Sequence, residues 1–171
     1  MRYLLDVNVM LAMCYEAHAH HDRVSSWLRE KRFVHSSSLR LATSPITELG
    51  FVRIASGPAG FASGVDEAQT DLERLVAQQG LAFVEDRLRA SPLPQWVRKF
   101  TQTTDGHLLQ VAVSHGLTLA TLDRGIRGAE VIPEIHVQPL RVQEAGVLVD
   151  KYPVDTHSVD EYSNDDGLWL R

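Results

Sequence analysis

The sequence predicts a three-layer α/β/α domain with a central parallel sheet of about four to five strands. Short apolar runs alternate along the chain with longer segments whose apolar residues recur at helical spacing, as in successive βαβ units. The runs show no polar alternation, which is typical of strands covered by helices on both faces. Hydrophobic residues make up 44% and charged residues 23% of the 171 residues, an ordinary globular composition.

The expected strands are compact apolar runs that polar residues or glycine interrupt. Tyr3-Leu4-Leu5 is fully apolar, as expected of a buried central strand. We expect strands at residues 3–5, 39–43, 81–84 and 118–122, a fifth at 135–137 and a further short candidate at 147–149.

The expected helices are recognised by apolar spacing and by residues that start or end helices. Val24, Trp27 and Leu28 fall on one helical face. Pro45 suits the first turn of a helix, and Gly80 suits the position just past the end of one. We expect helices beginning near residue 9 and covering residues 22–32, 45–56, 66–79 and 103–115.

Four acidic residues lie where these elements meet: Asp6, Glu48, Asp105 and Asp123. Because parallel sheets bind ligands outside the carboxyl ends of their strands, we expect the four carboxylates in one crevice. Carboxylates held close together repel, and a hard divalent cation with oxygen ligands, Mg²⁺ or Mn²⁺, relieves that repulsion.

Each acid also has an ordinary structural interpretation. Asp6 is a favoured residue for capping the helix that follows it. Glu48 and Asp105 lie in first turns of helices, where negative charge is favourable, and Asp123 precedes Arg124-Gly125 as in a turn. Asn8, two residues after Asp6, would orient that carboxylate if the segment is extended.

Four motifs carry a family resemblance, and they occur in order over roughly residues 1–140. They are Leu5-Asp6-Val7-Asn8-Val9, the run from Ala42 to Arg53 around Thr47-Glu48-Leu49, Thr104-Asp105-Gly106-His107-Leu108-Leu109, and Leu119-Ala120-Thr121-Leu122-Asp123-Arg124-Gly125. The ordered set resembles the PIN-domain ribonucleases, and most closely the toxins of VapBC-type toxin–antitoxin pairs.

The resemblance implies a metal-dependent endoribonuclease with a PIN-like fold. Its metal-binding and catalytic acids would be Asp6, Glu48, Asp105 and Asp123, with Mg²⁺ or Mn²⁺ as cofactor. Supporting polar positions would be Asn8 and Thr121. The resemblance also implies a homodimer and inhibition by a VapB-type antitoxin. Three arginines beyond the acids are candidates for RNA phosphate contacts: Arg53, Arg124 and Arg127.

The charge distribution divides the chain in two. Residues 1–141 hold 15 basic and 15 acidic residues, whereas residues 142–171 hold two basic and seven acidic residues and carry the whole net charge of −5. We therefore expect a nuclease domain at 1–141 and an acidic extension at 142–171. The single cysteine, Cys14, suits a reducing cytoplasm, and we expect neither a signal peptide nor a membrane span.

Other residues and other functions remain open at this point. His18, His20 and His21 are too nearly contiguous for one zinc ion and are interpreted as a polar joint between helices. Trp96, among basic residues, is the aromatic candidate for a base contact. Two alternative functions are a catalytically inert PIN-like binding module and a metal-dependent phosphoesterase for small substrates, which would form a phosphoenzyme on Asp6.

Overall fold

The computed structural model describes residues 1–135 and contains one parallel sheet of five strands in the order β3-β2-β1-β4-β5. The strands are β1 (Arg2–Leu5), β2 (Arg40–Thr43), β3 (Ala82–Phe83), β4 (Thr118–Thr121) and β5 (Glu130–Val131). The register places Leu4 beside Ala42 of β2 and Leu119 of β4, so β1 is the central strand.

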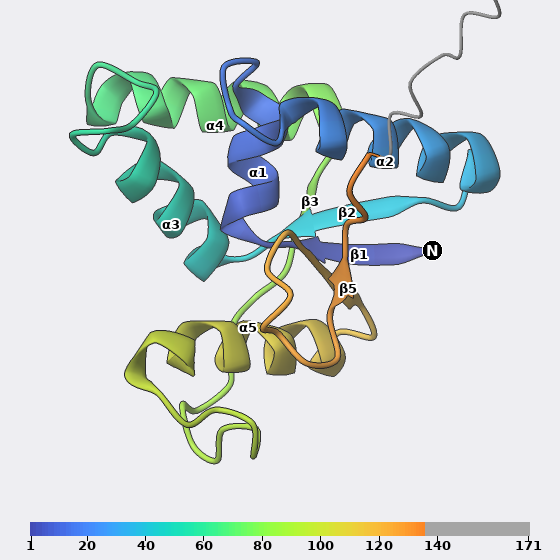
Figure 1. Cartoon of the computed structure of the whole chain (residues 1–171), viewed down its shortest axis with the longest axis vertical. Coiled ribbons are helices and arrows are strands. Elements are labelled where there is room, and N and C mark those ends of the chain that lie inside the picture. Colours follow the sequence, from blue (N-terminus) through green and yellow to red (C-terminus); the bar gives the residue numbers. More distant parts are fainter. Residues whose placement is uncertain (136–171) are drawn as a thin grey trace, which may run out of the picture. The chain divides into compact units, whose positions relative to one another are not determined.

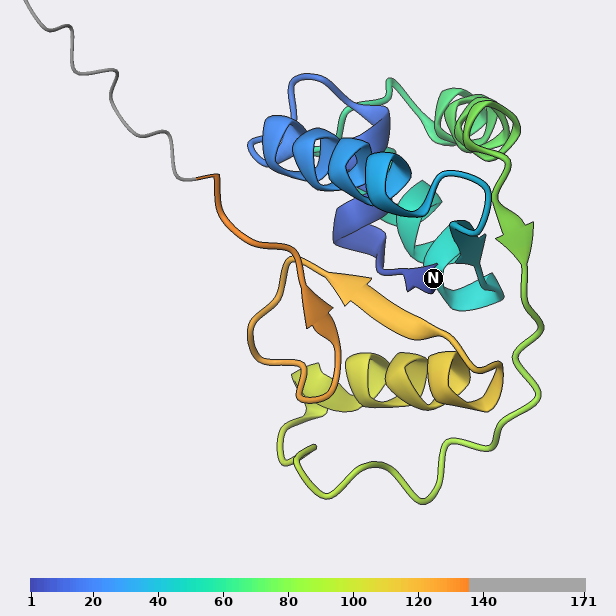
Figure 2. The ribbon, with the colours of Figure 1, turned by 90° about the vertical axis from the view of Figure 1, so that its right-hand side faces the viewer.

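Helices cover both faces of the sheet and give the predicted three layers (Figure 1). Four helices lie on one face and the fifth lies on the other, as the turned view in Figure 2 confirms. The first group is α1 (Val7–Cys14), α2 (His21–His35), α3 (Pro45–Ala55) and α4 (Val65–Gln79), and the opposite face carries α5 (Thr103–Ser114), which the short 3-10 helix η1 (Phe100–Gln102) precedes.

Side chains that alternate along β1 build two separate cores. Tyr3 and Leu5 pack into the cluster beneath α1 to α4, whereas Leu4 packs into the cluster beneath α5. All three side chains are fully buried. A strand buried on both faces needs a continuous apolar run, which is why β1 was recognisable in the sequence.

Local sequence signals fix the start of α3. The Ser44 hydroxyl accepts a hydrogen bond from the backbone N–H of Thr47, and the Thr47 hydroxyl accepts one from the backbone N–H of Ser44. Pro45 occupies the first turn, as predicted. These contacts set the direction in which α3 leaves β2, at the carboxyl edge of the sheet.

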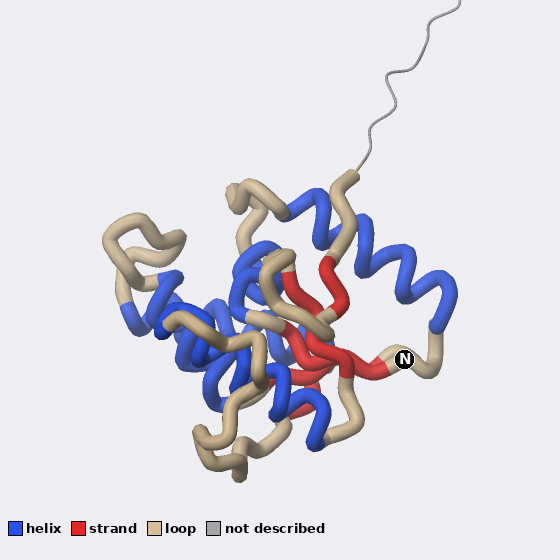
Figure 3. Tube along the Cα trace, turned by 60° about the horizontal axis from the view of Figure 1, so that its bottom comes forward, coloured by secondary structure: helices blue, strands red, loops and turns tan. Residues whose placement is uncertain are grey.

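The strand order reverses between β1 and β4. From β1 the chain moves outward through β2 to β3, and it then returns to the other side of β1 as β4. The backbone N–H of Asp6 donates to the carbonyl of Ala120 at 3.0 Å, so β1 and β4 remain hydrogen-bonded up to the carboxyl edge of the sheet. Figure 3 shows the strands gathered between the helices. A reversal of this kind is where open α/β sheets bind ligands.

The predicted position of the fifth strand needs correction. The fifth strand is Glu130–Val131, earlier than the predicted 135–137; Ile135 is in no strand, and residues 136 and 137, like the candidate at 147–149, lie outside the described residues. Within residues 1–135, no helix has the length and apolarity to cross a membrane.

Candidate active site

A pocket of about 330 Å³ opens at the reversal point, between α1, α3 and α5. Three of the predicted acids line it together: Asp6 from the end of β1, Asp123 from the loop after β4, and Asp105 from the first turn of α5. Asn8 and Arg53 line the same pocket. The structure thus brings together five of the residues that the sequence singled out.

Asp6 is the most firmly held of the three acids. Its side chain is only 7% exposed. One oxygen, Oδ1, accepts from the backbone N–H of Val7 at 2.7 Å, and the other, Oδ2, accepts from Thr121 Oγ1 at 2.6 Å and Asn8 Nδ2 at 2.8 Å. Asp6 is also the N-cap residue of α1, so its ordinary interpretation holds alongside the functional one.

Thr121 and Asn8 join the ends of β1 and β4. The Thr121 hydroxyl, fully buried, donates to Asp6 and accepts from the backbone N–H of Asp123 at 3.0 Å. The Asn8 amide donates to Asp6, while its oxygen accepts from the backbone N–H of Leu122 at 3.1 Å. These bonds fix the orientation of the Asp6 carboxylate and the start of the loop that carries Asp123.

Burial and like charges act together on two of the acids. Burial raises the pKa of Asp6, against hydrogen bonds from Thr121, Val7 and Asn8 that lower it, and the charge of Asp123 raises it further. Burial also raises the pKa of Asp105, and the charges of Asp6 and Asp123 add to that rise. Such raised values are typical of functional sites in which like charges meet.

Glu48 lies at the same edge of the sheet but outside this pocket. Its carboxylate accepts from Thr43 Oγ1 at 2.6 Å, at the end of β2. The side chain lines a separate groove between α3 and α4, with Leu49, Val52 and Leu72. The expectation that four acids share one crevice is therefore met by three of them.

The arginine candidates also differ in position. Arg53 lines the pocket from α3. Arg124 donates to the Glu134 carboxylate at 2.6 Å, with both side chains largely exposed, and Arg127 is exposed. Of the three arginines, Arg53 alone lines the pocket of the three acids.

The donor set fits a hard cation in chemistry, although its side chains are spread apart. Three carboxylates and the Asn8 amide offer oxygen ligands, which Mg²⁺ and Mn²⁺ prefer. Within residues 1–135, no three groups from His, Cys, Asp and Glu are spaced to hold an ion as they stand. Binding an ion would therefore require the less restrained Asp105 and Asp123 side chains to turn inward.

The structure adds His18 to the pocket, a residue that the sequence placed in a polar joint. It arrives from the segment between α1 and α2. Nothing in its local sequence marks it, because the contact depends on where that segment folds back. Trp96, the predicted base contact, is instead half-buried against the α5 core.

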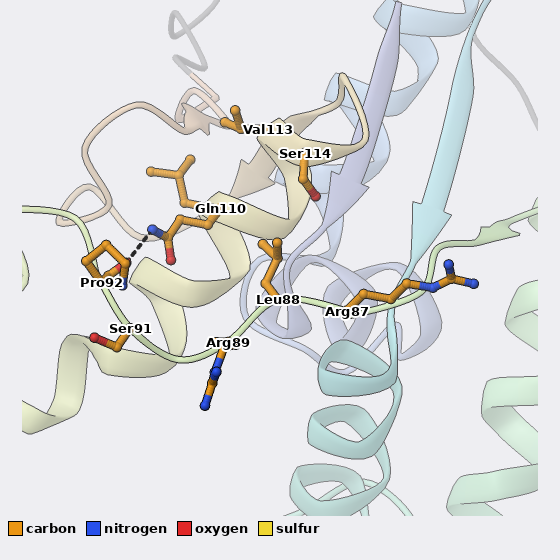
Figure 4. A pocket seen from close by; sticks show the side chains of 9 residues that line it. Arg87, Leu88, Arg89, Ser91, Pro92, Gln110, Val113 and Ser114 are labelled. Carbon is orange, nitrogen blue, oxygen red and sulfur yellow. Dashed lines mark hydrogen bonds between the residues drawn. The ribbon is translucent and has the colours of Figure 1, made fainter.

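A larger hollow lies elsewhere (Figure 4). It measures about 620 Å³ and is formed by residues 87–92 against the outer face of α5. Its lining includes Leu88, Val113 and Gln110, whose amide donates to the carbonyl of Pro92 at 2.8 Å. None of the predicted acids borders it, so its size does not make it the reactive site.

Comparisons with known proteins identify the family and the fold of this chain. The PIN domain family model matches residues 3–131. Ribonuclease VapC38 of Mycobacterium tuberculosis is 37% identical over 127 residues, which is 72% of this chain and 86% of that protein. Ribonuclease VapC29 of the same species is 32% identical over 130 residues, covering 74% and 89%. A crystal structure of VapBC2 from Rickettsia felis, bound to a DNA fragment from its promoter, has the same fold, with a TM-score of 0.51 at 14% identity over 77% of this chain and 97% of that one.

Proposed function

Because the chain belongs to the PIN-domain family, we propose that it is a metal-dependent endoribonuclease, the toxin of a VapBC-type pair. The observation that carries the proposal is the meeting of Asp6, Asp105 and Asp123 in one pocket at the reversal point of the sheet. Three carboxylates with two raised pKa values favour a site that operates with a bound cation.

The residues have separable roles in the proposed hydrolysis of an RNA phosphodiester. A bound Mg²⁺ or Mn²⁺ would neutralise charge and make a bound water lose its proton more readily than bulk water does. Asp6, Asp105 and Asp123 would hold the cation. Asn8 and Thr121 orient Asp6, and Arg53 contacts a phosphate beside the scissile one, so that the strand is aligned before the reaction.

Glu48 has a distinct place in the proposal. Its carboxylate accepts a hydrogen bond from Thr43, on the strand next to β1, and its side chain lines a groove separate from the pocket of the three acids. We therefore expect Glu48→Gln to reduce the cleavage rate less than Asp105→Asn does.

The proposal extends to the binding partners, the cellular compartment and the domain bounds of the chain. The fold match to a VapBC2 complex supports a VapB-type antitoxin as the partner. Exposed apolar side chains such as Leu49, 71% exposed on α3, suit a homodimer interface. RNA as substrate and a single cysteine suit the cytoplasm. Residues 1–141 form the nuclease domain and residues 142–171 an acidic extension.

The test is cleavage of labelled total RNA with Mg²⁺ or Mn²⁺, beside chelated protein and the Asp105→Asn variant. We expect cutting that disappears in both controls. Metal-independent cutting that survives in Asp105→Asn would point to a contaminant. Absence of cutting by folded, antitoxin-free protein across metals and RNAs would favour the inert binding module, and a phosphoenzyme trapped on Asp6 would favour the small-substrate phosphoesterase.

A further inference from the structure

Five rings from distant parts of the sequence form a row beside the carboxylate pocket. Tyr15 stacks on Phe51 and on Phe61, with centroids 5.8 and 4.6 Å apart and interplanar angles of 12° and 13°. Phe61 contacts His18 at 5.5 Å, and His18 contacts His20 at 5.8 Å. Phe51 is fully buried, and His20 is exposed, so the row leads from the core to the surface.

The row meets the pocket at His18. This half-buried ring lines the same pocket as Asp6, Asp105 and Asp123 and rests against Phe61, which is 38% exposed. The His18 ring has Phe61 as a neighbour and borders a charged pocket, and its incomplete burial distinguishes it from a core contact.

Hydrogen bonds hold the His18 ring in position. Its Nδ1 accepts from the backbone N–H of His20 at 3.1 Å, and its own backbone N–H donates to the carbonyl of Tyr15 at 3.0 Å. Burial lowers the pKa of His18, and the neighbouring His20 and His21 lower it further, which favours the neutral ring. With Nδ1 as acceptor, the proton of the neutral ring is on Nε2.

We propose that His18, supported by Phe61, is a stacking platform for the RNA base next to the phosphate held at the three acids. The inference rests on the proposed ribonuclease function and adds a subsite to it. Single-stranded RNA is bound by stacking of its unpaired bases on aromatic or histidine rings beside a groove that follows the backbone. Arg53 lines the pocket with His18, so one nucleotide finds both a phosphate contact and a base contact.

Ring order favours this role over simple packing. A ring held by a hydrogen bond and by a neighbouring ring tilted 39° to it loses little rotational freedom when a base stacks on it, so more of the stacking energy contributes to affinity. Stacking also accepts any base, because every base has a π-face. The subsite would therefore align the strand without selecting its sequence.

The test compares the loss of affinity caused by removing one base from the RNA with the loss caused by removing the His18 ring from the protein. Single-stranded RNA of about eight nucleotides, labelled with fluorescein, is prepared intact and with one abasic position moved along the strand. Affinity is measured by anisotropy with Mg²⁺ at low salt, and every protein carries Asp105→Asn so that bound RNA is not cut. His18→Ala, His18→Phe and the matched control His35→Ala are compared in this background.

We expect one abasic position to weaken binding to the parent by about tenfold. His18→Ala should weaken the binding of intact RNA by a similar factor, and in this variant the abasic position should cause no further loss of affinity. His18→Phe and His35→Ala should bind RNA with the affinity of the parent. Phe61→Leu, which keeps apolar bulk but removes the supporting ring, should show a smaller loss at the same position.

Equal abasic losses in the parent and in His18→Ala, or His18→Phe as weak as His18→Ala, would overturn the platform. If the active protein still cuts RNA in that case, the ribonuclease proposal stands and only the subsite is lost. If the protein without Asp105→Asn does not cut RNA and the Asp105→Asn parent does not bind RNA, both proposals fall.

Discussion

At the scale of single residues, the proposed site depends on how Asp6 is held, and Thr121 is the residue that holds it most closely. Thr121→Val removes the hydroxyl that donates to Asp6 at 2.6 Å and accepts from Asp123 at 3.0 Å, with little change in shape. Because residues that orient a metal ligand typically contribute 10- to 100-fold, we expect Mn²⁺ affinity and cleavage rate to fall by about that factor.

Thr118→Val, three residues earlier on β4, is the matched control, since the Thr118 hydroxyl makes no hydrogen bond within residues 1–135. It should leave both quantities unchanged. Mn²⁺ titration and initial cleavage rates, with circular dichroism to verify the fold, decide the matter. Equal behaviour of the two variants would remove Thr121 from the site.

The raised pKa of Asp105 predicts how the metal-free protein responds to pH. Because burial and the charges of Asp6 and Asp123 raise its folded-state pKa above the unfolded value of about 3.9, the folded state binds that proton more tightly. Stability should therefore fall as pH rises through the interval between the two pKa values and stay at its lower level above it.

Asp105→Asn removes this ionisation. In chelator, we expect the variant to have the larger free energy of unfolding at pH 7, with the difference narrowing toward pH 4. Urea unfolding at several pH values measures it. Mn²⁺ should reverse the order by stabilising the parent alone. A variant less stable than the parent in chelator at pH 7 would contradict the repulsion inferred here.

The residues that the sequence located best are those tied to strand ends. Asp6 follows β1 directly and one residue separates Asp123 from the end of β4, and a parallel sheet brings such ends together whatever the loops do. Glu48 illustrates the limit: its helix was predicted, but the direction of its side chain toward Thr43 depends on one rotamer. The presence of His18 in the pocket could not be predicted from the sequence, because its position depends on packing against Phe61 from a distant segment.

At the scale of elements, a glycine fixes how α5 packs beside the site. A Cβ added at Gly106, next to Asp105, would lie 2.4 Å from Val97 Cγ2 and 3.3 Å from Pro94 Cδ. Alanine gains about 1 kcal/mol over glycine in helix propensity, but overpacking of this kind costs about 1–3 kcal/mol. We expect Gly106→Ala to be destabilised overall, as measured by urea unfolding.

A second substitution isolates the cause. Val97→Ala removes the methyl groups that the new Cβ would meet, so the double variant should recover stability relative to Gly106→Ala alone. If Gly106→Ala proves more stable than the parent, the segment around Val97 does not pack on α5 as described.

The strands show why element boundaries were predicted unevenly. β1, β2 and β4 are buried runs and stood out in the sequence. β5 has only two residues, and side chains elsewhere hold it: the Glu130 carboxylate accepts from Tyr3 Oη at 2.7 Å and Trp27 Nε1 at 3.2 Å, and pairs with Lys31 at 2.8 Å. The local apolar pattern at residues 135–137 favoured a strand there, but these distant contacts hold the strand that pairs with β4 at residues 130–131.

At the scale of the whole molecule, the described strands and cores lie in one part of the chain and the net charge comes from another. Among residues 1–135, which the structure describes, the five strands and two cores end by residue 132, whereas the net charge of −5 comes entirely from residues 142–171. Folding should therefore depend on the first part, and the long-range repulsion of a polyanion should depend on the last thirty residues.

Cutting the chain after Arg141 separates the two contributions. We expect a melting temperature within a few degrees of the full chain, because no described core residue is lost. RNA affinity should rise several-fold at low salt, and the gain should vanish at high salt, where exposed charges are screened.

A full-length chain with the seven acids of residues 142–171 changed to their amides is the matched control for charge alone. If repulsion is the cause, it should reproduce the gain of the truncated chain at every salt concentration, in binding by anisotropy and in cleavage rate. A gain seen only on truncation, and insensitive to salt, would mean that these residues act by occupying the RNA site. No gain in either chain would confine the acidic extension to a role outside RNA binding.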